Sequence, residues 1–141
     1  MSLLTHDTIG ILKEAKTPED CIIAAGEYLE KGGYITNDYT KAMIKNFEIN
    51  GPYFVLAPAL AMPHARPTDG VLKNGISLIT LKTPVNFGSE NDPVKVVLAL
   101  ATSSSDEHLE YMSKIAMALR EEDIIERIYH CQSIEEMMNI I

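Results

Sequence analysis

The sequence predicts one compact domain of stacked helices and strands, of the α/β or α+β class. The chain has 141 residues and 46% of them are hydrophobic, which suffices for one sizeable core. Apolar residues recur with a helical period towards both ends of the chain, and they form short continuous runs in the middle. The predicted order is therefore helices, then strands, then helices, without an internal repeat, low-complexity tract or linker.

The first predicted helix lies between Thr17 and Gly32. Thr17 offers a capping hydroxyl, Pro18 suits the first helical position, and Gly32 with the glycine after it supplies a stop. A second helix should follow Thr36 and end near Gly51. The residues expected to face the core are Ile22, Ala25, Gly26 and Leu29 in the first helix and Tyr39, Ala42, Met43 and Phe47 in the second.

Short apolar runs in the middle of the chain predict strands. They cover residues 53–57, 60–62, 76–81 and 94–100. Pro58 separates the first two runs and Pro63 closes the second. The last two runs are apolar at nearly every position, as expected for central strands that helices cover on both faces. Gly88 and Asp92-Pro93 mark the turn between them.

Helical spacing returns after the polar segment 103–106. The apolar residues that recur there one to two helical turns apart are Leu109, Met112, Ala116 and Leu119. Two shorter helices are predicted to finish the chain, one from Asp123 to about His130 and one from Ser133 onwards. Ser133 and Glu136 match the capping-box pattern at the start of the last helix.

The charge balance and the apolar runs exclude several classes of partner. The chain has 12 Lys and Arg against 20 Asp and Glu, a formal charge of -8 that repels nucleic-acid phosphates, so we expect no nucleic-acid partner. The longest apolar runs, such as 94–101, are far shorter than the roughly 20 residues that cross a bilayer. The N-terminus lacks a secretory signal pattern, so we expect a cytoplasmic protein. Cys21 and Cys131 are expected to be reduced packing residues.

His64 is the first candidate for chemistry. It follows an apolar run and lies between Pro63 and Pro67, which fix their own φ and favour extended conformations in the residues before them. A histidine in this setting lies on a rigid backbone segment at the end of a sheet, where binding and catalytic groups are common. The alternative, a hydrogen-bonded structural histidine, stays open at this point.

His108 is the second candidate. It falls in the first turn of a predicted helix, where free N–H groups and the positive end of the helix dipole attract anions such as phosphate. The alternative is a solvated polar residue beside Asp106 and Glu107. If both candidates act on one phosphoryl group, their imidazoles should lie roughly 4 to 8 Å apart. His6 and His130 lack such a setting and are left out of the site.

A metal site finds little support in the sequence. No His-x-x-x-His pair or Cys/His cluster occurs, and Asp69 is the only carboxylate close after His64. A metal-dependent hydrolase that uses His64, His108 and Asp69 is therefore a minor alternative. We expect no metal and no other cofactor.

The sequence resembles a known family around the first candidate histidine. The segment Leu60-Ala61-Met62-Pro63-His64-Ala65 is similar to the signature around the phosphorylated histidine in the mannitol/fructose type of A domains of sugar phosphotransferase systems. Further landmarks follow the order of that family along most of the chain: 31–34, Asp38-Tyr39 with Ala42-Met43, 94–101, Glu107-His108, and 124–127 followed by Ser133. Within the family, residues 51–55, 57–58 and 62–67 most resemble the ascorbate-specific A components.

The resemblance implies a structure, two partners and a transported sugar. It implies an α/β fold, with a mixed sheet flanked by helices, in one A domain over residues 1–141. Phosphorylated HPr would donate to His64, and a cysteine of the B component, EIIB, would accept the group. The membrane component EIIC is involved only indirectly, and L-ascorbate is the expected sugar. His108 is implied to lie beside His64 in the site.

The sequence departs from the family at one position. Mannitol-type members carry an arginine near the end of the second helix that helps to hold the phosphate, whereas this chain has Asn46 and Glu48 there. We expect Arg66 to replace it, because a planar guanidinium suits phosphate oxygens, with Lys45 as a weaker candidate. The alternative is that Arg66 points to solvent or forms a surface ion pair with Asp69.

The expected mechanism is nucleophilic. An imidazole with a pKa of about 6.5 is largely neutral at neutral pH and can attack phosphorus without a separate strong base. A backbone carbonyl near residues 63–67 can hold the proton on the other ring nitrogen. His108, the helix start with Ser105, and Arg66 can stabilise the phosphoryl oxygens without a metal.

Two expectations about partners complete the prediction. The apolar residues Phe54, Leu60 and Met62 are available to exclude water or to dock a partner. The main alternative function is a regulatory binding module, in which phosphorylation of His64 switches affinity for a protein and no B component accepts the group.

Overall fold

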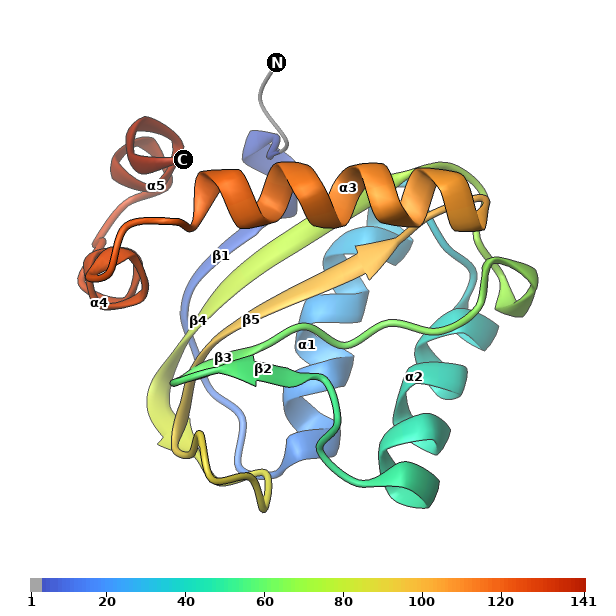
Figure 1. Ribbon diagram of the computed structural model, residues 1–141, viewed down its shortest axis with the longest axis horizontal. Helices are drawn as coiled ribbons and strands as arrows, with labels where there is room; N and C mark the ends of the chain where they lie inside the picture. The colour runs from blue at the N-terminus through green and yellow to red at the C-terminus, as the bar shows by residue number, and fades with distance from the viewer. Residues whose placement is uncertain (1–3) are drawn as a thin grey trace.

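The strands form one mixed sheet. A computed structural model describes residues 4–141. Within this range the strands are β1 (Ile9–Lys13), β2 (Val55–Ala57), β3 (Leu60–Ala61), β4 (Gly75–Val85) and β5 (Val94–Ala101). Their order in the sheet is β1-β4-β5-β3-β2 (Figure 1). β1 with β4 and β3 with β5 pair in parallel, whereas β4 with β5 and β2 with β3 pair antiparallel.

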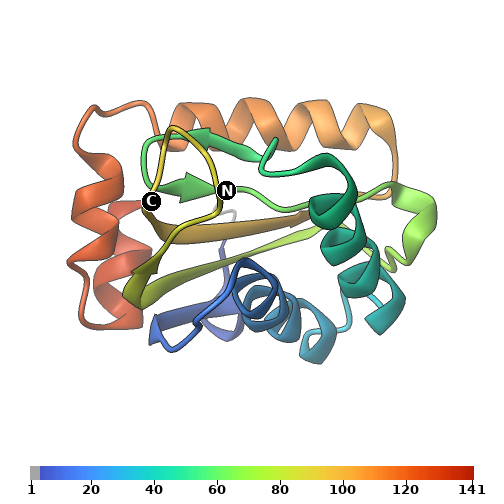
Figure 2. The same cartoon turned by 90° about the horizontal axis from the view of Figure 1, so that it is seen from below.

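Helices cover both faces of this sheet. α1 (Pro18–Lys31) and α2 (Asn37–Asn50) lie on one face, and α3 (Ser105–Ala118) lies along the other (Figure 2). α4 (Ile124–Tyr129) and α5 (Ile134–Ile140) continue the chain at the end of α3. Each face has its own cluster of buried apolar side chains, so the fold is the expected mixed sheet flanked by helices.

β5 shows why its sequence is apolar at almost every position. Alternate side chains of a strand point to opposite faces. Val97, Ala99 and Ala101 therefore pack in the cluster beneath α1 and α2. Val96, Leu98 and Leu100 pack in the cluster beneath α3, α4 and α5. The predicted central position of this strand is confirmed, because β4 pairs with one of its edges and β3 with the other.

The predicted helix ends are confirmed where capping residues mark them. The Thr17 hydroxyl accepts a hydrogen bond from the Asp20 N–H at 3.1 Å, as a cap of α1 should. Gly33 follows the end of α1 with a φ of 78°, a left-handed conformation that suits glycine. The Ser133 hydroxyl accepts from the Glu136 N–H at 3.1 Å at the start of α5.

The predicted order is wrong at the N-terminal end, where β1 precedes all the long helices. This strand lies at the edge of the sheet, and its register against β4 shifts between Gly10 and Lys13. Leu12 has a φ of 49° and donates its N–H to the Thr80 hydroxyl at 2.8 Å. The irregularity turns Leu12 towards solvent and interrupts the period-two pattern that marks a strand.

One predicted strand is corrected. The expected strand 53–57 begins only at Val55, because Tyr53 lies in the turn before it. The helix predicted after residues 103–106 is confirmed as α3, with Ile115 buried and Leu109 68% exposed.

Both cysteines of the chain, Cys21 and Cys131, are free and buried, as expected for packing residues. Among residues 4–141, no helix is both long and apolar enough to cross a membrane.

Candidate functional site

His64 stands where the chain leaves the sheet. β3 ends at Ala61 beside the central strand β5, and the Leu100 N–H donates to the Pro63 carbonyl at 3.1 Å, which ties the following segment to β5. The His64 Nδ1 lies 2.8 Å from the Met62 carbonyl oxygen. Because a carbonyl only accepts, Nδ1 carries the proton and Nε2 keeps the lone pair. The expected backbone acceptor is therefore present.

His108 lies in the first turn of α3, and its ring lies beside the His64 ring. The Ser104 hydroxyl caps α3 by accepting from the Glu107 N–H at 3.1 Å, and the His108 N–H donates to the Ser104 carbonyl at 3.0 Å. The centroids of the His64 and His108 rings are 5.2 Å apart, with a 47° angle between the ring planes. This spacing lies within the expected range, while the chemical roles of both residues stay predictions.

The pKa of His108 lies below its ordinary value. Burial of the side chain is the main cause, and the positive charge of His64, when that ring is protonated, is the second. A lowered pKa keeps His108 neutral at neutral pH. One of its ring nitrogens then carries a proton that can be donated to an anion.

Tyr53 is the third ring of the site, and it was not among the site residues predicted from the sequence. Its ring meets the His64 ring edge to face, with centroids 6.0 Å apart and planes at 79°. Partial burial raises the pKa of Tyr53, an effect that a hydrogen bond from the Asn46 side chain partly offsets. Asn46 is one of the positions at which the family arginine was expected. The only signal in the sequence was the aromatic residue directly after Pro52, in the turn before the candidate segment.

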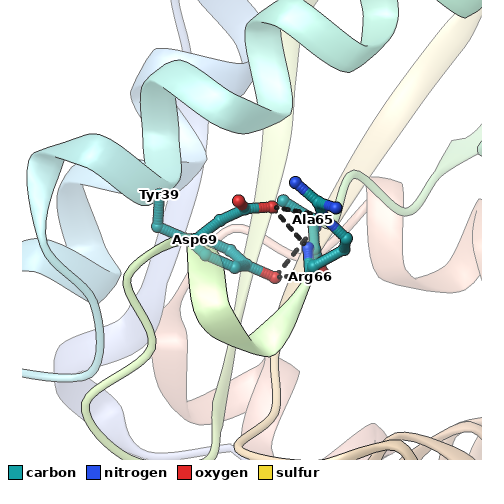
Figure 3. Close-up of polar contacts among 4 residues, drawn as sticks. All are labelled: Tyr39, Ala65, Arg66 and Asp69. Carbon is teal, nitrogen blue, oxygen red and sulfur yellow. Dashed lines mark hydrogen bonds and ion pairs between the residues drawn. The ribbon is translucent and has the colours of Figure 1, made fainter.

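Tyr39 holds the backbone directly after His64. Its hydroxyl accepts a hydrogen bond from the Ala65 N–H at 2.9 Å and donates to the Leu100 carbonyl at 2.7 Å. Figure 3 shows the phenol reaching from α2 to the Ala65 backbone. The sequence placed Tyr39 on the inner face of its helix, which is confirmed, but helical spacing alone does not reveal its hydroxyl contacts.

Arg66 is engaged by Asp69. The Asp69 carboxylate accepts from the Arg66 N–H at 2.9 Å and from Nε at 3.5 Å, at the start of the short 3-10 helix η2 (Pro67–Asp69; Figure 3). The Arg66 side chain is 82% exposed, and it borders a groove of about 350 Å³ with Lys41 and Lys45. This is the surface ion pair that was the alternative to phosphate binding.

Ser105 and the two histidines that were left out of the site have separate settings. Ser105 is the first residue of α3 and is exposed, while its neighbour Ser104 acts as the cap. His6 pairs with Glu135 through Nε2 at 3.0 Å, so its contact joins the first and last parts of the described chain. His130 hydrogen-bonds through Nδ1 with the carbonyl of its own helix at 2.7 Å. Within residues 4–141 no three His, Cys, Asp or Glu side chains gather closely enough to hold a metal ion.

The apolar residues expected to exclude water or to dock a partner are core residues. All three are buried: Phe54 packs in the cluster beneath α1 and α2, and Leu60 and Met62 pack in the cluster beneath α3, α4 and α5. Tyr53 contacts the His64 ring and is 44% exposed. Water and protein partners can therefore reach the Tyr53 side chain.

Comparisons with known proteins agree on one family. Residues 2–141 match the family model described as "Phosphoenolpyruvate-dependent sugar phosphotransferase system, EIIA 2". An ascorbate-specific PTS system EIIA component from Shigella boydii is 35% identical over 142 aligned positions, which cover 99% of this chain and 92% of that protein.

Solved structures share the fold. A PTS IIA protein from Streptococcus mutans superimposes with a TM-score of 0.88 at 36% identity, over 96% of this chain and 86% of that one. The A component in the Escherichia coli complex of enzyme IIA mannitol with phosphorylated enzyme IIB mannitol superimposes with a TM-score of 0.84 at 31% identity, over 97% of this chain and 95% of that one.

Proposed function

Because the chain belongs to the EIIA 2 family of the phosphoenolpyruvate-dependent sugar phosphotransferase system, we propose that His64 takes a phosphoryl group from one protein and passes it to another. The observation that carries the proposal is the pair of rings, in which His64 has its Nδ1 occupied by the Met62 carbonyl and lies 5.2 Å from His108 between ring centroids. This arrangement leaves one nitrogen of His64 for attack and a second imidazole within reach of the transferred group.

The accepting step needs no outside base. The lone pair on Nε2 of His64 attacks phosphorus, and the P–N bond of the donor phosphohistidine breaks as the new P–N bond forms. The donor imidazole leaves with the electron pair of the broken bond. The proton on Nδ1 of His64 stays in place, because the Met62 carbonyl continues to accept it.

Charge on the phosphoryl oxygens is met by groups of α3 and by His108. The first turn of a long helix presents backbone N–H groups and the positive end of its dipole, and Ser105 opens this turn. His108 adds a ring N–H close to His64. Pre-positioned donors of this kind supply most of the catalysis that phosphoryl transfer requires.

We assign the partners by family. Phosphorylated HPr is the proposed donor, and a cysteine of EIIB is the proposed acceptor, whose thiolate attacks phosphorus and releases the His64 imidazole. A related A component is solved in complex with phosphorylated enzyme IIB, which supports EIIB as the partner. The ascorbate-specific relative supports L-ascorbate as the sugar. The membrane component EIIC takes part only through EIIB, and the protein works in the cytoplasm.

The proposal is tested by reconstituting the transfer with purified proteins. Phosphorylated HPr is mixed with this protein, and EIIB candidates for ascorbate and for mannitol are added separately. We expect phosphate on the wild-type protein and onward transfer to the ascorbate EIIB. The His64→Ala variant should take up no phosphate, whereas His108→Ala should take it up and pass it on slowly. The His130→Ala variant is the matched control and should behave as wild type.

Two outcomes would change the assignment. Phosphate uptake by His64→Ala would mean that another residue attacks phosphorus. Uptake by the wild-type protein without transfer to any EIIB would favour the regulatory module, in which phosphorylation of His64 changes binding to a different protein.

A further inference from the structure

The backbone of His64 lies inside a closed circuit of hydrogen bonds. The Pro63 carbonyl accepts from the Leu100 N–H at 3.1 Å. The Leu100 carbonyl accepts from the Tyr39 hydroxyl at 2.7 Å, and that hydroxyl accepts from the Ala65 N–H at 2.9 Å. The chain from Pro63 to Ala65 closes the circuit. Both backbone neighbours of His64 are therefore fixed to the same residue of β5.

The same circuit reaches the segment that carries His108. Leu100 is the penultimate residue of β5, and the chain continues from this strand through the Ser104 cap into α3. Ala65 is the residue after His64. The Tyr39 hydroxyl thus joins the two backbone segments from which the paired imidazoles project, at a point where no covalent connection lies between them.

We propose that Tyr39 is a positioning residue, whose hydroxyl sets the separation and orientation of the His64 and His108 rings for phosphoryl transfer. The inference rests on the proposed function. It assigns a role in transfer to a residue that does not touch the phosphoryl group and that acts only through the backbone on either side of it.

The surroundings of Tyr39 hold its hydroxyl in one position and keep it protonated. The side chain is 1% exposed and packs in the cluster beneath α1 and α2. Burial, followed by the carboxylate of Asp69, raises the pKa of Tyr39 to about 12, against the opposing effect of its bond with the Ala65 backbone. The hydroxyl therefore keeps its proton and can donate and accept at the same time.

The ring and the hydroxyl of Tyr39 can be separated by substitution. Tyr39→Phe keeps the apolar ring in the core, but it leaves the Ala65 N–H and the Leu100 carbonyl without the bridge between them. The bond between Leu100 and Pro63 remains. The variant should fold with a looser segment around His64, because one link of the circuit survives.

Thr40 offers a matched control for lost stability. It is the next residue of α2, is 3% exposed, and donates its hydroxyl to the Glu30 carboxylate at 2.8 Å. Thr40→Val therefore removes a buried hydroxyl bond from the same helix without touching the circuit. A loss of function that follows stability alone should appear in both variants.

The first measurement is the single-turnover rate from phosphorylated His64 to EIIB, at a temperature below both unfolding transitions. Misplacement of the reacting groups lowers the transfer rate far more than it weakens binding of the partner. We therefore expect Tyr39→Phe to lower the rate at saturating EIIB by at least about tenfold, while the half-saturating EIIB concentration stays within about twofold of wild type. Thr40→Val should keep the wild-type rate. Equal losses in the two variants, or a wild-type rate in Tyr39→Phe, would overturn the proposal.

The second measurement does not require transfer. The His64 and His108 rings are titrated by 15N NMR in the unphosphorylated protein. Tyr39→Phe should raise the pKa of His108 towards its ordinary value, because the looser pair weakens the effect of His64, and Thr40→Val should leave it unchanged. An unaltered His108 titration in Tyr39→Phe would remove the positioning role. If wild-type protein takes up no phosphate, the proposed function fails while this titration still tests Tyr39.

A second variant covers the case in which Tyr39→Phe does not fold. An amide-to-ester replacement at Ala65 removes the backbone N–H that donates to the Tyr39 hydroxyl, and it leaves the bond from that hydroxyl to the Leu100 carbonyl in place. We expect a smaller loss in the same transfer rate and the same direction of change in the His108 titration. No change in either would overturn the proposal.

Discussion

The Nδ1 of His64 and the carbonyl oxygen of Met62 are 2.8 Å apart, within a segment that leads straight out of β3. The bond spans only two residues, so it forms together with the local backbone and does not depend on a partner. It assigns the tautomer of the imidazole before any phosphoryl group arrives. The reactivity of the two ring nitrogens is therefore unequal from the start.

The first prediction concerns the site of the phosphoryl group on His64. Phosphorus should be bonded to Nε2, because Nδ1 is occupied by its hydrogen bond to the Met62 carbonyl. Two-dimensional 1H–15N NMR of the phosphorylated protein distinguishes the two ring nitrogens by their shifts and couplings. A phosphoryl group on Nδ1 would mean that this bond breaks before transfer.

Patterns that act within one element were sufficient to predict much of the fold. β5 is apolar on both faces because both faces are buried, and α1 carries its cap at Thr17 and its stop at Gly33 in the local sequence. β1 could not be predicted in this way. Its shape depends on the register shift against β4 and on the bond from Leu12 to Thr80, both of which are tertiary contacts.

In the candidate site, too, residues marked by the local sequence were predicted, whereas residues that depend on tertiary contacts were not. His64 and His108 were predicted from their settings, between prolines and at a helix start, together with the family resemblance. Tyr39 and Tyr53 are not, since their roles depend on contacts with residues 26 and 11 positions away. Helical spacing indicated that Tyr39 faces the core, but an apolar position and a hydrogen-bonding one look alike in such a pattern.

The second prediction concerns the pH dependence of stability. The pKa of His108 is lowered in the folded protein from 6.5, so the unfolded chain binds this proton more readily. The contribution of His108 to the free energy of unfolding is thus fully present above about pH 6.5. It is lost as pH falls towards the folded-state pKa.

Urea unfolding at several pH values measures this contribution. We expect the free energy of unfolding to fall between neutral pH and pH of about 5, and to fall less in His108→Gln, which cannot take up the proton. An identical fall in the two proteins would assign the pH dependence to other groups.

The third prediction concerns Arg66. Its pair with Asp69 is exposed, and such pairs contribute under about 1 kcal/mol, so a phosphoryl group with nearly two negative charges can compete for the guanidinium. Arg66 has an extended backbone, with φ -80° and ψ 151°. An extended backbone is required for side chains two residues apart, such as Arg66 and His64, to point to the same side. Arg66→Ala should shift the phosphorylation equilibrium with HPr away from His64 by roughly tenfold, equivalent to one charge-assisted bond of about 1.5 kcal/mol.

Low salt is the right condition for this measurement, because screening weakens interactions of exposed charges. Arg66→Lys should recover part of the loss, since it keeps the charge without the planar fork. An unchanged equilibrium in Arg66→Ala would leave Arg66 as a surface partner of Asp69, with His108 and the start of α3 as the groups that hold the phosphate.

The last prediction concerns Tyr53 as a wall of the site. Its ring meets the His64 ring edge to face at 6.0 Å between centroids, and an aromatic contact of this kind contributes about 0.5 to 1.5 kcal/mol. Removal of the ring should let water reach the phosphoryl group and let the imidazole turn. We therefore expect Tyr53→Ala to shorten the lifetime of phosphorylated His64, without an acceptor present, by about two- to tenfold.

Tyr53→Phe keeps the ring, so the lifetime of phosphorylated His64 in this variant should stay within about twofold of wild type. Leu56→Ala is the matched control, because Leu56 is a similarly exposed apolar residue in the adjacent β2. Equal lifetimes in Tyr53→Phe and Tyr53→Ala, both shorter than wild type, would instead assign the protection to the hydroxyl that Asn46 holds.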